Sequence, residues 1–176
     1  MLQKAPAPFA DFVLGLSPED IPSPVMARAE DLVLDLIGVS AAAQDLDASR
    51  IVREMAIRQL GAGPGTAPAR LLFDNREASP AGAAWAGANQ IDSLDAHDGY
   101  SPAKGHAGCG LLPGVLAFLE PDAELSGPDF LAAMVIGYEI ASRAVPETGV
   151  GHPHSLALEQ VESWLTYSCN FRNNQR

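Results

Sequence analysis

A segment near the N-terminus is apolar on every side of a predicted helix. Apolar residues recur at helical spacing from Val25 onward, and Leu32 to Ile37 spread them around the whole circumference. A helix without a polar face needs partners on all sides, so we expect it inside a larger helical assembly. Ser23 is the predicted N-cap, and the small residues of 38–43 allow another helix to approach closely.

Further helices are predicted along the chain, at 48–60, 81–89, 111–120 and 130–144. On the helix over 48–60 we expect the apolar side chains of Ile51, Met55 and Leu60 to face inward. We expect those of Arg50, Arg53 and Arg58 to face outward. Ser79 is the predicted N-cap of the helix over 81–89. Alternating strand patterns are missing from the sequence, so we expect an all-α helical bundle.

Composition narrows the classes of function. The 176 residues hold 11 Lys and Arg against 22 Asp and Glu, which gives a net charge of −11. Nucleic-acid binding needs a basic face, so we expect no nucleic-acid partner. Apolar runs are shorter than the about 18–20 residues of a membrane span, and the first residues do not resemble a signal peptide. With only two cysteines in the chain, we expect a cytoplasmic protein without a membrane partner.

The polar centre of the chain could carry chemistry. Ionisable residues gather within fifteen positions there, among several glycines: Asp92, Asp95, His97, Asp98, Lys104 and His106. Carboxylate, imidazole and ammonium groups in one loop can move protons and hold an anionic substrate. A solvated surface loop explains the same residues equally well. A metal site is a third interpretation, but the spacing matches no zinc signature, and we expect Cys109 to be a packing residue.

Five segments in register resemble the MmgE/PrpD family, which includes 2-methylcitrate dehydratases, cis-aconitate decarboxylases and iminodisuccinate epimerases. They are Asp35–Val39, Ser79–Asn89, Leu94–Tyr100, Gly105–Gly108 and Gly137–Arg143. The resemblance implies the N-terminal portion of a large helical domain whose α+β lid is absent here. It also implies a lyase or isomerase that works without cofactor or metal on a small di- or tricarboxylate, by proton transfer next to a carboxylate.

The resemblance also assigns roles to residues. Asp95 and His106 match the catalytic Asp and His, with His106 as acid or base and Asp95 orienting it. The substrate-binding positions implied are His97, Asp98, Gly99 and Lys104. Gly99 falls where dehydratases and decarboxylases often have Thr, while Tyr100 and Ala107 replace the family's usual His and Pro. Substrate identity, and lyase against epimerase activity, therefore stay open.

The resemblance ends near Ala144. We therefore expect a domain over 1–144 and a divergent, partly disordered tail over 145–176 in which His152 or His154 could replace a second family histidine. This ending suggests a truncated chain, and two alternatives to catalysis follow from it. One is an inactive remnant that serves as a helical interaction module or homodimer, and the other is a protein that binds small acids without reaction.

Overall fold

The computed structural model describes residues 7–100, 105–119 and 125–148. Helices account for most of these residues, in the order α1 (Ala7–Gly15), a 3-10 turn η1 (Pro18–Asp20), α2 (Ser23–Ala43), α3 (Asp47–Gln59), α4 (Pro80–Asp92), α5 (Gly108–Phe118) and α6 (Gly127–Thr148). The sheet between α3 and α4 consists of β1 (Ala69–Arg70) and β2 (Glu77–Ala78), which pair antiparallel. The prediction of an all-α fold is confirmed.

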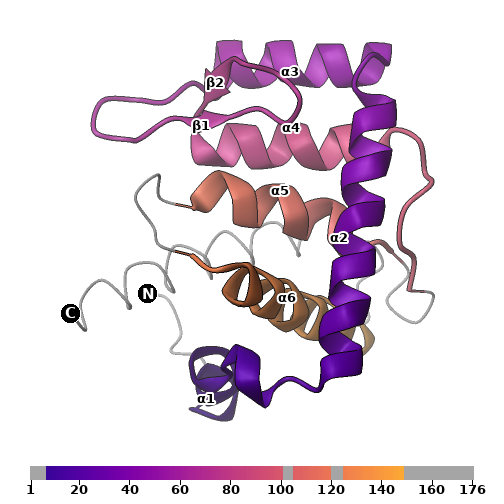
Figure 1. Ribbon diagram of the computed structural model, residues 1–176. Helices are drawn as coiled ribbons and strands as arrows, with labels where there is room; N and C mark the ends of the chain where they lie inside the picture. The colour runs from indigo at the N-terminus through magenta and orange to yellow at the C-terminus, as the bar shows by residue number, and fades with distance from the viewer. Residues whose placement is uncertain (1–6, 101–104, 120–124, 149–176) are drawn as a thin grey trace.

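The helices are layered. Helices α3, α4 and α5 lie in successive layers, and α2 crosses these layers along one side (Figure 1). Helix α6 packs against α5 and α2 below them. The largest buried side chains fill the space between α2, α4, α5 and α6, and they include Leu36, Ile91, Leu111, Leu112 and Met134. A second cluster, rich in alanine, lies between α3, α4 and the β1–β2 hairpin.

Small residues let the layers approach closely. A Cβ atom at Gly87 of α4 would lie 2.6 Å from Cβ of Pro113 in α5. A Cβ atom at Gly137 of α6 would lie 2.4 Å from Cδ2 of Leu111. Such separations leave no room for a methyl group, so glycine at these two positions sets the distance between helices.

The predicted N-caps have different outcomes. The Ser79 side chain accepts a hydrogen bond from the Gly82 backbone N–H at 3.1 Å, as an N-cap does. Ser23 is not an N-cap, because α2 already begins at this residue and Pro22 precedes it. The proline ring fixes φ next to the first turn, so the chain enters the helix one residue earlier than predicted.

The predicted orientation of α3 is confirmed for Arg50 and Arg58, which are exposed, and wrong for Arg53 and for the apolar residues Ile51, Met55 and Leu60. Arg53 is buried, at 7% exposure, whereas Ile51 and Met55 are exposed at 65% and 48%. The Arg53 guanidinium donates to the Gln44 carbonyl oxygen at 2.7 Å, and its Nε lies 3.3 Å from the Asp74 carboxylate. These partners compensate for burying the charge, and α3 is turned so that Arg53 faces the core together with Val52, Ala56 and Ile57, whereas Ile51 and Met55 do not.

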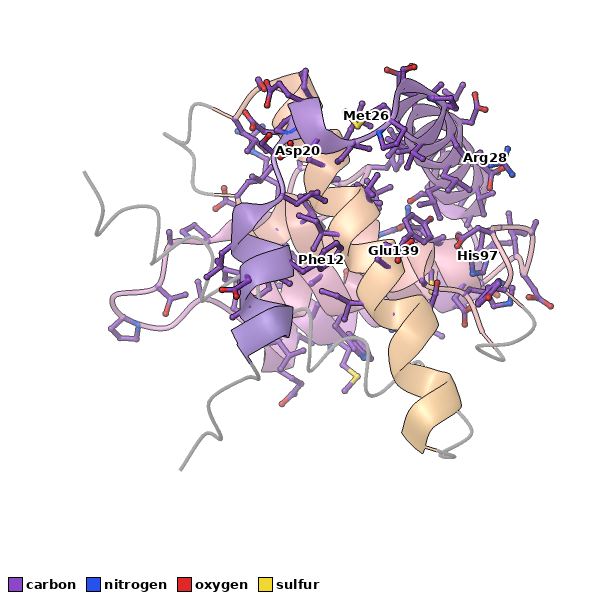
Figure 2. All side chains as sticks on the ribbon, turned by 90° about the horizontal axis from the view of Figure 1, so that it is seen from below. Phe12, Asp20, Met26, Arg28, His97 and Glu139 are labelled. Atoms are coloured by element: carbon purple, nitrogen blue, oxygen red, sulfur yellow. The ribbon has the colours of Figure 1, made fainter. Side chains whose placement is uncertain are left out.

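Helix α2 is confirmed as a helix, but apolar side chains on part of it reach the surface. Leu34 is 71% exposed and Ile37 is 42% exposed, while Leu36 is fully buried. Figure 2 shows Arg28 on the outer side of α2, where it pairs with Asp31. Among the residues that the structure describes, no helix has both the length and the apolar character of a membrane span.

Candidate functional site

The candidate site lies in the loop that joins α4 to α5. A tight turn ends α4, in which the Asp95 backbone N–H donates to the Asp92 carbonyl oxygen at 3.0 Å. Asp95 has a φ of 48°, in the left-handed region that Asp tolerates better than most residues. The turn directs the Asp95 carboxylate outward, where 85% of the side chain is exposed.

His106 lies opposite Asp95. Its Nε2 is 3.5 Å from Asp95 Oδ1, and its Nδ1 contacts the backbone carbonyl oxygen of Asp98. A carbonyl oxygen can only accept, so Nδ1 carries the hydrogen and the lone pair of the neutral ring belongs to Nε2. With 26% of its side chain exposed, the ring can accept a proton at Nε2 from a ligand, and the Asp95 carboxylate then faces the imidazolium.

Asp98 joins the loop to α5. Its Oδ2 accepts a hydrogen bond from the Gly108 backbone N–H at 3.2 Å, at the first residue of the helix. A carboxylate at this end of a helix is stabilised by the helix dipole. The Tyr138 hydroxyl of α6 packs on the other side of the same carboxylate, and burial, followed by the Asp98 charge, raises the pKa of Tyr138. Asp98 therefore fixes both the loop and the ring of His106.

His97 lies beneath His106. Its side chain is 0% exposed, and the two ring centroids are 4.3 Å apart with the planes tilted by 42°. Burial, followed by the proximity of His106, lowers the pKa of His97, so the ring is neutral at neutral pH. Among the described residues, neither ring nitrogen of His97 has a hydrogen-bond partner, although Nε2 lies 3.5 Å from Asp92 Oδ1.

Of the remaining predicted site residues, Gly99 lies beside the same ring. A Cβ atom there would be 3.5 Å from Cε1 of His106, which is ordinary contact distance. Next to it the backbone of Tyr100 pairs with Gly105, with an N to O distance of 3.0 Å. Lys104 lies outside the described residues, as do His152 and His154.

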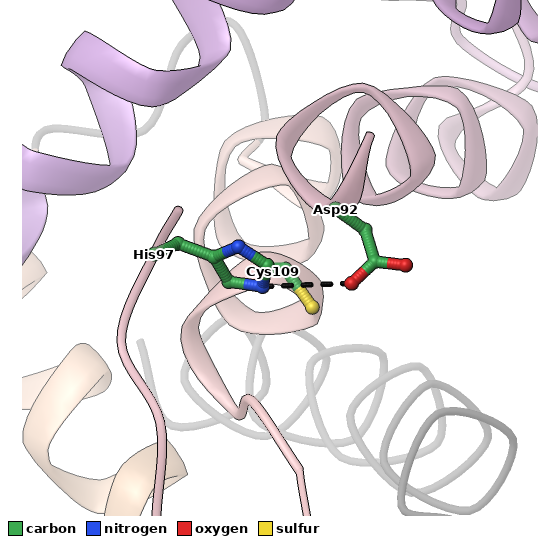
Figure 3. A group of neighbouring side chains, drawn as sticks. All are labelled: Asp92, His97 and Cys109. Atoms are coloured by element: carbon green, nitrogen blue, oxygen red, sulfur yellow. Dashed lines mark ion pairs between the residues drawn. The ribbon is translucent and has the colours of Figure 1, made fainter. Parts of the chain in front are cut away.

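One group of ligand-type residues was not anticipated from the sequence. Asp92, His97 and Cys109 each present one ligand atom, and these atoms lie within 4.8 Å of one another (Figure 3). Burial, followed by the charges of Asp92 and Asp98, raises the pKa of the Cys109 thiol to about 12, and the thiol donates to the His106 carbonyl oxygen at 3.2 Å. Asp92 closes α4 and Cys109 opens α5, so only the placement of the two helix ends could have revealed the group.

Comparison with known proteins agrees with the sequence motifs. Residues 7–161 match the family model described as the MmgE/PrpD N-terminal domain. The chain is similar to a cis-aconitate decarboxylase-like protein of Aspergillus oryzae, with 29% identity over 143 residues. The match covers 78% of this chain but 29% of that protein, so the chain spans less than a third of the relative's length. No solved structure matches the chain.

Proposed function

The chain belongs to the MmgE/PrpD family, and from that premise we propose that it carries the proton-transfer residues of a lyase or isomerase for a small di- or tricarboxylic acid. The observation that supports this most is the position of His106. Its Nδ1 is held by the Asp98 carbonyl oxygen and its Nε2 faces Asp95, so the ring has a fixed tautomer and a carboxylate partner.

The proposed reaction starts with Nε2 of His106 as base. It takes the proton from the carbon next to a substrate carboxylate, and the electron pair left on that carbon spreads into the carboxylate as an enediolate. The new imidazolium faces Asp95, whose charge offsets its own. Delivery of a proton from solvent to the opposite face gives an epimer. When a β-hydroxyl group leaves instead, the His106 imidazolium returns its proton to the hydroxyl oxygen, so that water departs and an alkene forms. In a decarboxylation, His106 instead delivers a proton to the carbon that has lost carbon dioxide.

Neighbouring residues would position the substrate. Gly99 places no side chain of its own against the Cε1 and Nδ1 edge of the His106 ring, where a Cβ atom would lie 3.5 Å from Cε1. Lys104 supplies a cation for a substrate carboxylate, a role carried over from the family resemblance. We assign Asp98 to positioning, since its side chain holds Gly108 and its carbonyl oxygen holds His106. His97 supports the ring from the buried side.

Hydrogen exchange tests the proton-transfer step by itself. The chain is incubated in deuterium oxide with 2-methylcitrate, cis-aconitate, itaconate or iminodisuccinate, and loss of the proton next to a carboxylate is followed by nuclear magnetic resonance. We expect exchange with at least one acid, and a loss of about 100-fold or more in His106→Gln. Asp95→Asn removes the carboxylate that faces Nε2 of His106 and should also slow the exchange, and Asp31→Asn, which changes a carboxylate on the outer side of α2, is its matched control. A folded protein that exchanges no proton, or exchanges equally well as His106→Gln, would contradict the proposal.

A second candidate function is association, either with another copy or with a partner helix. Its basis is the exposure of large apolar side chains on two helices, Leu34 on α2 and Ile51 and Met55 on α3. Exposed apolar surface favours contact with another protein. Sedimentation equilibrium tests this candidate: a dimer that Leu34→Gln or Ile51→Gln dissociates supports it, and a monomer at all concentrations refutes it.

A further inference from the structure

We propose that Asp92, His97 and Cys109 form a binding site for a zinc-like divalent cation, in which the three side chains supply three ligands and water the fourth. The site joins the last residue of α4, the loop and the first turn of α5. It is distinct from the proton-transfer pair, because none of its ligands is Asp95 or His106. It therefore does not depend on the proposed reaction.

The ligand types and distances suit such a cation. Thiolate, imidazole and carboxylate are the ligands that zinc prefers, and three protein ligands with one open position is a common arrangement. The 3.5 Å between His97 Nε2 and Asp92 Oδ1 is close to the roughly 3.4 Å that separates two such ligands around a tetrahedral zinc ion. The Sγ atom of Cys109 lies within 4.8 Å of both atoms, so a small rotation of side chains closes the triangle. Asp92 is 47% exposed, which leaves a path for the ion.

The buried imidazole points to a missing ligand. His97 is fully covered, yet neither ring nitrogen has a hydrogen-bond partner among the described residues. A buried polar group without a partner is costly, and its presence calls for an explanation such as an ion.

The surrounding charge favours a cation as well. Asp92 is the last residue of α4, at the negative end of the helix dipole, and no basic residue lies in the last turn of that helix. The carboxylate of Asp92, and that of Asp98 at the Gly108 N–H next to Cys109, would attract a dication. With the Asp92 carboxylate and a Cys109 thiolate as ligands, two negative charges balance the two positive charges of the ion.

Binding involves one proton. The Cys109 thiol loses its hydrogen to solvent, and the bond from sulfur to the metal replaces the hydrogen bond that the thiol donates to the His106 carbonyl oxygen. No electron is transferred, and the cation keeps its charge. The complex would tie the end of α4 to the start of α5 across the loop.

Cobalt and zinc binding test the site. Co²⁺ is added to the reduced, metal-free protein, and the thiolate-to-cobalt absorption in the near ultraviolet is followed. Zn²⁺ is then titrated by calorimetry with release of a proton as a second signal. We expect one Co²⁺ per chain, displaced by Zn²⁺, and a thermal midpoint raised by about 5–10 °C at a free Zn²⁺ concentration about a hundred times the dissociation constant.

Variants identify the ligands. Cys109→Ser and His97→Gln should lose the absorption and weaken Zn²⁺ binding at least tenfold. Asp92→Asn, which changes a half-exposed side chain and leaves the fold intact, should also weaken binding at least tenfold. Cys169→Ser, at the second cysteine of the chain, and Asp31→Asn, at an exposed carboxylate of α2, are the matched controls and should bind as the unaltered chain does. No metal bound by the folded protein, binding that survives both Cys109→Ser and Asp92→Asn, or binding that either control abolishes would each overturn the proposal.

Discussion

The close contact between α4 and α5 at Gly87 predicts that one added methyl group there lowers the stability of the fold. In Gly87→Ala the new Cβ atom would lie 2.6 Å from Cβ of Pro113 and 3.1 Å from Cδ1 of Leu72. Leu72 can move aside by a change of rotamer, but Pro113 cannot yield easily, since it is rigid and fully buried. Overpacking of this kind costs about 1–3 kcal/mol, and a separation of 2.6 Å places the cost near the upper end. Alanine recovers about 0.5–1 kcal/mol of helix propensity, so we expect a net loss of about 1–2 kcal/mol.

The matched control is Gly38→Ala in α2, because a Cβ atom there would meet no other atom within 4 Å. This variant keeps the gain in propensity without the clash and should be more stable than the unaltered chain by about 0.5–1 kcal/mol. Urea denaturation followed by circular dichroism measures both changes, and the thermal midpoint of Gly87→Ala should fall by about 3–6 °C. If Gly87→Ala were as stable as Gly38→Ala, the two helices would not be in the contact described.

Three further predictions concern side chains that join elements. Arg53→Ala should lower the free energy of unfolding by about 3–5 kcal/mol in urea denaturation, because it removes a buried guanidinium from Asp74 and Gln90. Its control is Arg28→Ala on the outer surface, which should change the free energy of unfolding by less than about 0.5 kcal/mol. Asp98→Ala should cost about 1 kcal/mol by removing the acceptor of the Gly108 N–H, and Asp98→Asn should restore most of it; equal losses in both would exclude a capping role. The hydrogen bond from Arg76 lowers the pKa of Asp74 below its ordinary 3.8. The ionised Asp74 therefore adds to the free energy of unfolding above pH 3.8, and this contribution is lost as the pH falls through the lowered pKa. Arg76→Gln should reduce this loss of stability in denaturation curves taken from about pH 5 to pH 2.

Much of the helical framework could be predicted from local sequence. Apolar spacing located α2, α3, α4, α5 and α6, and the Ser79–Pro80 pair placed the start of α4 within one residue and its N-cap at Ser79. The start of α5 was predicted three residues too late, at 111. Gly108 and Gly110 argue against a helix on propensity, but the Asp98 carboxylate holds the Gly108 N–H, and this contact comes from ten residues away. Local propensity gives way where a tertiary contact satisfies the first turn.

The orientation of α3 could not be predicted for a similar reason. A charged arginine is expected on the exposed face of a helix, and Arg53 is buried only because its partners compensate for the loss of water. Those partners are the Gln44 carbonyl oxygen, the Gln90 side chain and Asp74, which lie as far as 37 residues from Arg53 in sequence. The alanines of α4 leave enough room for the guanidinium to reach them. A pattern read along one helix carries no information on such distant partners.

The candidate site, too, could be predicted from the sequence only in part. Family motifs brought Asp95 and His106 to attention, and the structure places them 3.5 Å apart. The roles given to these two residues, and to His97, Asp98, Gly99 and Lys104, stay predictions. The sequence did not reveal that the Asp98 carbonyl oxygen fixes the His106 tautomer, because this depends on a backbone atom. It also did not connect Asp92 with Cys109, which are 17 residues apart. These two residues lie close together only because the fold brings the end of α4 next to the start of α5 in space.

Two buried polar side chains of this fold, Gln90 and His97, differ in whether their hydrogen-bonding atoms have partners. Gln90 is buried between α2 and α4, and its amide donates to the Ser40 carbonyl oxygen at 2.9 Å and to Ser40 Oγ at 3.0 Å while its oxygen accepts from Arg53. Such a satisfied network holds the layers together. His97 is as deeply buried, yet its ring nitrogens have no such partners among the described residues. The proposed cation site would supply partners for the ring nitrogens of His97. Because the Asp92 side chain is half-exposed whereas that of His97 is fully covered, Asp92→Asn is the substitution that separates loss of metal binding from loss of packing.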